Sequence, residues 1–102
     1  MIRTLIVEDD ATVAEVNRGY LERIPGFSVM MSVTTGAAAV DVVARQQIDL
    51  VLLDFFLPDM RGLDVCRALR SASPPPVDIM AVTAARDAYT VRSAVAFGSC
   101  ST

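Results

Sequence analysis

The chain has 102 residues, of which 53% are apolar, and a formal net charge of −3. These values predict a single domain with its own core and exclude an intrinsically disordered chain. All nine basic residues are arginines dispersed along the chain, which argues against direct nucleic-acid binding because that function requires a clustered basic face.

No apolar run approaches the roughly 20 residues of a membrane span. Residues 1–4 lead directly into a strand-like segment, without the layout of a signal peptide. We therefore expect a cytoplasmic protein with no membrane partner.

The first 24 residues predict a strand followed by a helix. Residues 4–7 are apolar and end at the acidic run Glu8-Asp9-Asp10. From Asp10 or Ala11 onwards, four apolar residues recur at helical spacing, namely Val13, Val16, Tyr20 and Ile24. Pro25-Gly26 predicts the end of this helix.

Residues 27–47 repeat the pattern. Residues 27–33 alternate between apolar and polar, which predicts an outer strand with one wetter side. The apolar face of this strand is predicted to carry Phe27, Val29, Met31 and Val33. Thr34 or Thr35 can cap a second helix that extends to about Gln47 and turns Ala39, Val40 and Val43 towards the sheet.

Residues 48–62 contain the segment around which the chain is organised. Residues 50–53 are an unbroken apolar run, typical of a central parallel strand buried on both faces. Asp54 ends this run, and Pro58 and Gly62 predict a loop after it. Considered alone, Asp54 is better explained as a turn residue, but this end of a parallel strand also faces the crevice where open α/β sheets bind ligands.

Residues 63–102 predict two helices and one strand. Leu63, Cys66 and Leu69 lie at helical spacing, and prolines 74–76 end this third helix. Residues 77–82 form a fourth strand that ends at Thr83, and a fourth helix begins at about Asp87. Strand and helix thus alternate four times with short connections, which predicts an α/β fold with a parallel sheet and right-handed crossovers.

The predicted sheet gathers Asp9, Asp10, Asp54 and Thr83 at the carboxyl ends of its strands. Two carboxylates about 4 Å apart repel by about 4 kcal/mol at an effective dielectric constant near 20, so the group requires a cation. Hard oxygen ligands with open positions predict Mg²⁺. A divalent cation beside a carboxylate and a hydroxyl suits phosphoryl transfer, with Asp54 as the nucleophile that forms an acyl phosphate.

Three segments together resemble the signature segments of the response-regulator receiver domain of two-component signalling. They are Leu-Ile-Val-Glu-Asp-Asp at 5–10, Asp-Phe-Phe-Leu-Pro-Asp-Met-Arg-Gly at 54–62 and Ala-Val-Thr-Ala at 81–84. The helix around 17–23 and the Leu-Pro-Asp-Met loop look most like receivers of regulators paired with citrate- and dicarboxylate-sensing kinases. The resemblance covers nearly the whole chain and implies a flavodoxin-like, doubly wound sheet with strand order 2-1-3-4-5.

The resemblance also implies roles for individual residues. Asp54 would be the phosphoacceptor for a sensor histidine kinase, and Thr83 the switch hydroxyl. Asp9 and Asp10 would hold Mg²⁺ together with Asp54 and the backbone carbonyl of Phe56. Such a domain is a signalling switch rather than an enzyme, with at most self-catalysed phosphorylation and dephosphorylation, and it controls an output domain, here expected to act in transcription. Two further carboxylates, Asp59 and Asp64, are expected to be solvated and outside the site.

Receivers of this family continue with a fifth strand, a lysine at its end and a fifth helix. No lysine is present among the 102 residues, and residues 99–102 are not strand-like. We therefore expect residues 1–102 to form a receiver domain that is incomplete at its C-terminus. Without a fifth strand, the fourth strand would be an unprotected apolar edge, so we expect self-association through this edge or through the first and fourth helices.

Two other functions remain open from the sequence. The chain could be a receiver that is no longer phosphorylated and acts only by docking or dimerisation, as the missing lysine suggests. It could also be an aspartyl-nucleophile phosphatase of the haloacid-dehalogenase type. That class needs a second aspartate two residues after the first, where this chain has Phe56, so we rank it last.

Overall fold

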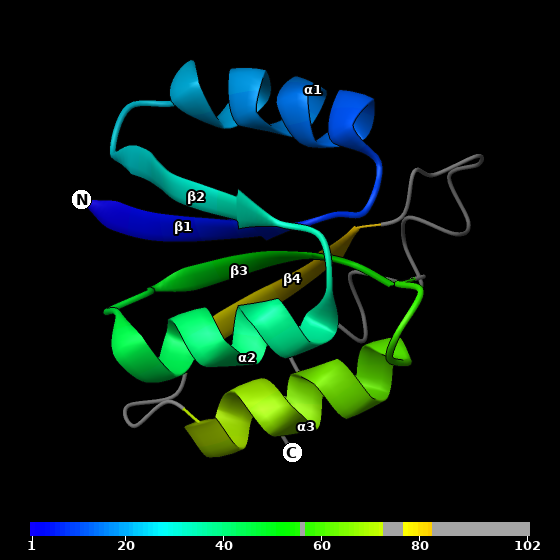
Figure 1. Cartoon of the computed structure of the whole chain (residues 1–102). Coiled ribbons are helices and arrows are strands. Elements are labelled where there is room, and N and C mark those ends of the chain that lie inside the picture. The colour runs from blue at the N-terminus through cyan, green and yellow to red at the C-terminus, as the bar shows by residue number, and fades with distance from the viewer. Residues whose placement is uncertain (56, 73–76, 83–102) are drawn as a thin grey trace.

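The computed structural model describes residues 1–55, 57–72 and 77–82 (Figure 1). Strands and helices alternate along them: β1 (Ile2–Val7), α1 (Ala11–Glu22), β2 (Phe27–Val33), α2 (Gly36–Arg45), β3 (Leu50–Asp54), α3 (Gly62–Ala72) and β4 (Asp78–Val82). The predicted fourth helix from Asp87 lies outside the described residues.

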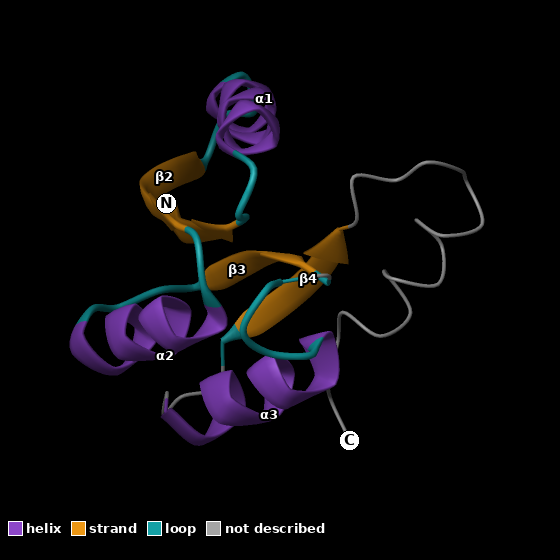
Figure 2. Ribbon diagram, turned by 45° about the vertical axis from the view of Figure 1, so that its right-hand side comes forward, coloured by secondary structure: helices purple, strands orange, loops and turns teal. Residues whose placement is uncertain are grey.

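The strands form one parallel sheet in the order β2-β1-β3-β4, which confirms the predicted fold class and strand order. Helix α1 covers one face of the sheet, while α2 and α3 lie side by side on the other (Figure 2). This two-sided cover explains why β3 is an unbroken apolar run.

The core is divided by the sheet into two clusters. The larger lies between the sheet and helices α2 and α3, and the smaller lies beneath α1. On β3, Val51 and Leu53 belong to the larger cluster and Leu52 to the smaller. Ala39 and Val43 of α2 are buried as predicted, and Val40 packs against the same cluster.

Helix α1 was predicted correctly, but two of the apolar residues whose spacing predicted it lie at the surface. It ends at Glu22 rather than at Ile24, and it buries Ala14 and Leu21. Val16 and Tyr20 are 52% and 65% exposed. Two apolar stripes both recur at helical spacing on this helix, and periodicity alone does not say which one faces the sheet.

The predicted apolar face of β2 is interrupted by a bulge. Its pairing with β1 shifts register so that Thr4 lies opposite Val29 and Leu5 opposite Met31. The extra residue, Met30, reverses the side-chain alternation. Phe27 and Val29 therefore pack beneath α1, whereas Met31 and Val33 pack on the other face.

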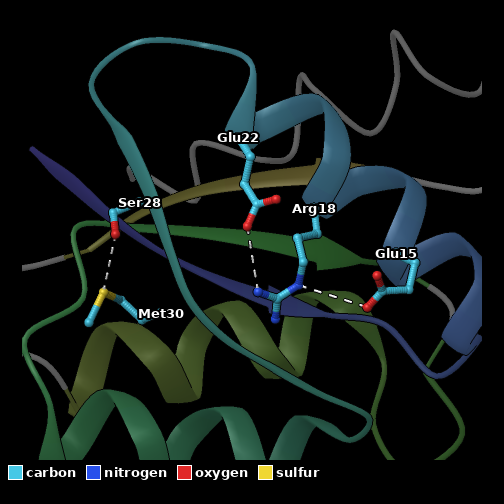
Figure 3. A network of polar contacts seen from close by, with 5 residues as sticks. All are labelled: Glu15, Arg18, Glu22, Ser28 and Met30. Carbon is cyan, nitrogen blue, oxygen red and sulfur yellow. Dashed lines mark hydrogen bonds and ion pairs between the residues drawn. The ribbon is translucent and has the colours of Figure 1, made fainter.

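Figure 3 shows the polar contacts among side chains of α1 and among side chains of β2. Arg18 of α1 lies between Glu15 and Glu22, with N–O distances of 3.9 and 3.8 Å. On β2, Ser28 Oγ donates to Met30 Sδ at 3.7 Å. Exposed ion pairs of this kind contribute little to stability, so α1 is held mainly by its apolar contacts.

Among the described residues, no helix combines the length and the apolar character needed to cross a bilayer.

Two leucines on α3 test the assignment of its faces. Leu69 is 0% exposed in the larger cluster, so Leu69→Ala should lower the free energy of unfolding by about 2–5 kcal/mol through loss of burial and a residual cavity. Leu63 is 42% exposed, and Leu63→Ala should cost less than about 1 kcal/mol. Urea unfolding followed by circular dichroism measures both, and equal losses would contradict the assignment.

Candidate functional site

Three carboxylates meet at the carboxyl ends of β1 and β3. Glu8 and Asp9 follow β1, and Asp54 is the last residue of β3. Because Val7 lies opposite Leu53 in the parallel ladder, the two strands end at the same level. Carboxylate oxygens of Glu8, Asp9 and Asp54 all lie within 4.8 Å of one another. We call these three residues the acidic cluster.

Asp10 is not part of this cluster, contrary to the sequence-based expectation. It is the N-cap of α1, and its Oδ1 accepts hydrogen bonds from the backbone N–H groups of Thr12 and Val13 at 2.8 and 3.1 Å. Glu8 lies in the acidic cluster, and the sequence analysis did not include it among the candidate ligands. The available signal was that Glu8 is the first residue after the apolar strand, while Asp10 directly precedes the helical periodicity, as an N-cap does.

Burial of the cluster perturbs its most enclosed member. Glu8 is 5% exposed and Asp54 8%. The pKa of Glu8 is raised to about 7, chiefly by desolvation; a hydrogen bond and charge repulsion with Asp54 also raise it, and the Asp10 backbone N–H lowers it. That N–H donates to Glu8 Oε2 at 3.1 Å. Near neutral pH Glu8 therefore tends to keep a proton.

Two predicted site residues cannot be placed. Thr83, the predicted switch hydroxyl, and Phe56, whose carbonyl was predicted to bind the metal, lie outside the described residues.

The loop after Asp54 carries an acid whose role was also missed. Asp59 is exposed and outside the acidic cluster, as expected, but in addition its Oδ1 and Oδ2 accept hydrogen bonds from the backbone N–H groups of Gly36 and Ala37, at 2.9 and 3.1 Å. These two bonds hold the pKa of Asp59 below its ordinary value. The carboxylate thus caps helix α2 from another part of the chain.

The acidic cluster fits a divalent cation. It presents hard oxygen atoms from three carboxylates, the donor type that Mg²⁺ prefers. Glu8 and Asp54 are both buried, and the charge of Asp54 raises the cost of ionising Glu8. A cation would relieve this cost, so Glu8, Asp9 and Asp54 are the residues that could hold one.

A comparison with protein families decides what kind of domain this is. Residues 4–101 match the response regulator receiver domain. The chain belongs to this family. Receiver domains are signalling domains, and the parallel sheet and acidic cluster described above agree with that assignment.

Curated relatives of this receiver domain include the probable C4-dicarboxylate response regulator DctR of Halalkalibacterium halodurans. It is 39% identical over 98 residues, which are 96% of this chain and 42% of the relative. The transcriptional regulatory protein DcuR of Escherichia coli K12 is 36% identical over 100 residues, 96% of this chain and 41% of the relative. The chain thus spans less than half the length of these relatives.

Solved structures show the same fold. The signal receiver domain of the putative response regulator NarL from Mycobacterium tuberculosis superimposes with a TM-score of 0.76 at 25% identity, over 96% of this chain and 78% of that one. The MaeR response regulator bound to beryllium trifluoride gives a TM-score of 0.70 at 38% identity, over 96% and 80% of the two chains.

The raised pKa of Glu8 predicts a pH dependence of stability in the absence of divalent cations. Between its ordinary value of 4.5 and about 7, the folded receiver binds more protons at Glu8 than the unfolded chain does. The stabilisation is therefore full below pH 4.5 and is lost as the pH rises through about 7. The free energy of unfolding of the wild type, minus that of Glu8→Gln, should fall over this range.

Urea unfolding of both proteins across this pH range measures the difference. Subtracting the variant removes the contributions of the carboxylates that do not interact with Glu8, because these titrate alike in both proteins. A difference that stays constant or increases with pH would contradict the assignment of the raised pKa to Glu8.

Proposed function

We propose that this receiver domain takes a phosphoryl group from a sensor histidine kinase onto Asp54. A carboxylate oxygen of Asp54 would attack the phosphorus atom of a phosphohistidine, the phosphorus–nitrogen bond would break, and an acyl phosphate would form. The observation that carries this proposal is the acidic cluster, in which a strand-end carboxylate lies beside two others that can bind a metal.

Mg²⁺ would be held by Glu8, Asp9 and Asp54, with Glu8 in place of the predicted Asp10. When bound, it would neutralise the negative charge that gathers around the incoming phosphoryl group. The backbone carbonyl of Phe56 as a further ligand, and the Thr83 hydroxyl as a contact to a phosphoryl oxygen, remain parts of the proposal that rest on the family. MaeR, a similar receiver, is bound to beryllium trifluoride, and we propose that this chain binds the same group beside Asp54.

The relatives suggest the signalling context. DctR is named as a C4-dicarboxylate response regulator and DcuR as a transcriptional regulatory protein. We propose that this receiver responds to a dicarboxylate- or citrate-sensing kinase, and that in the whole protein it controls a transcriptional output domain.

Phosphoryl transfer can be tested on the chain itself. Incubation with Mg²⁺ and acetyl phosphate should add one phosphoryl group, detected by intact-protein mass spectrometry, and Asp54→Asn should abolish the adduct because the nucleophile is lost. Asp64→Asn is the matched control, since it removes one exposed carboxylate from the first turn of α3. An adduct that survives in Asp54→Asn would place the chemistry elsewhere.

The ligand set of the metal can be separated from helix capping. Glu8→Gln should weaken Mg²⁺ binding by at least about tenfold, because it removes an oxygen ligand that is charged when the metal binds. Asp10→Asn removes the same charge two residues away but keeps a side-chain acceptor for the α1 cap, so the Mg²⁺ affinity should be unchanged. Calorimetric titration measures both, and the opposite ranking would restore Asp10 as the ligand.

One observation favours a second function, docking or dimerisation. Within the described part of the chain, β4 pairs with β3 on one side only, and Met80 is 45% exposed. An apolar strand in this position can pair with a second copy. In light scattering, the average molecular mass should rise towards that of a dimer as the protein concentration increases. A monomer mass at all concentrations would exclude dimerisation.

A further inference from the structure

The loop between Asp54 and α3 is fastened to a helix that does not adjoin it in the sequence. Asp59 of this loop bonds through both carboxylate oxygens to Gly36 and Ala37, the first two residues of α2. Gly36 and Ala37 precede Asp59 in the sequence by 23 and 22 positions. The side chain of Asp59 is therefore a tie between two segments rather than a local turn contact.

Helix α2 already has a cap of its own. Thr35 is its N-cap, and Thr35 Oγ1 accepts a hydrogen bond from the backbone N–H of Ala38 at 3.1 Å. Asp59 satisfies two additional first-turn donors. Thr35 and Asp59 thus both cap the N-terminus of α2, but only Asp59 also restrains the loop.

Close packing supports this tie. A Cβ atom on Gly36 would lie 2.8 Å from Met60 Sδ and 2.9 Å from Val65 Cγ2, so the start of α2 packs closely against Met60, the residue next to Asp59, and against Val65 of α3. At the other end of the loop, the ring of Phe55 occupies the space that a Cβ on Gly62 would need. Phe55 directly follows Asp54. The loop is therefore restrained at two places, by the packing of Phe55 on Gly62 and by the hydrogen bonds of Asp59.

We propose that Asp59 is a positioning residue for the acidic cluster: its bonds to α2 hold the loop in the place that lets Asp54 bind Mg²⁺ and accept a phosphoryl group. This inference rests on the proposed function and adds to it a carboxylate that does not belong to the acidic cluster. Asp59 acts through the backbone of the loop, in the way that outer groups orient metal ligands.

The test compares Asp59→Ala with Thr35→Ala. Both variants remove N-terminal capping from α2 and should lower the midpoint of urea unfolding. Only Asp59→Ala frees the loop, so it should weaken Mg²⁺ binding by about tenfold and slow adduct formation with acetyl phosphate by a similar factor, while Thr35→Ala leaves both unchanged. Asp59→Asn, which keeps one carbonyl acceptor, should fall between Asp59→Ala and the wild type and covers the case in which the alanine variant does not fold.

A second readout does not depend on metal or phosphoryl chemistry. Amide hydrogen exchange of Phe55 and Gly62, measured by NMR without Mg²⁺, should be faster in the Asp59 variants than in the wild type and unchanged in Thr35→Ala. If the wild type neither binds Mg²⁺ nor forms an adduct, the proposed function fails, yet these exchange rates still decide whether Asp59 holds the loop. Equal effects of Thr35→Ala and Asp59→Ala on Mg²⁺ affinity and exchange, or none from Asp59→Ala, would overturn the inference.

Discussion

The repulsion among carboxylates at the ends of β1 and β3 is the constraint on which the site depends. Parallel pairing brings Glu8 and Asp9 to the level of Asp54, and burial removes much of the water that would screen Glu8 and Asp54. The fold can tolerate this arrangement in two ways. A proton can remain on Glu8, whose pKa is about 7, or a cation can replace it. The site can therefore hold either a proton or a cation.

Burial of apolar side chains offsets the free-energy cost of placing these carboxylates close together. Val51, Leu52 and Leu53 alternate between the two core clusters, so β3 is anchored from both faces. Fully burying each such side chain contributes about 1.5–3 kcal/mol. This is comparable to the repulsion between two close carboxylates, so the burial of β3 can offset the cost of keeping Asp54 beside Glu8.

The sequence predicted the parts of the fold that depend on local pattern. The unbroken run of β3, the alternation of strands with helices and the Thr35 cap each have a direct signal, and the resemblance supplied the strand order. The features that the sequence did not predict have a common cause: in each case the local pattern is compatible with more than one arrangement. Helix α1 offers two apolar stripes, the bulge at Met30 reverses the faces of β2, and three consecutive acids can enter the site in more than one pairing. Tertiary packing makes those choices.

The bonds of Asp59 lie furthest beyond the reach of sequence patterns, because they join residues more than 20 positions apart. The sequence feature that comes closest to indicating these bonds is the pair of glycines, Gly36 and Gly62, at the segments that the loop contacts. At Gly36 the obstructing atoms belong to the side chains of Met60 and Val65, and the flexible end of Met60 can shift. At Gly62 the obstructing atoms belong to the ring of Phe55, the residue that follows Asp54, so a side chain at this position would displace that ring. The two glycines therefore differ in consequence: crowding at Gly36 disturbs the fastening of the loop, whereas crowding at Gly62 displaces the ring of the residue beside the phosphoacceptor candidate itself.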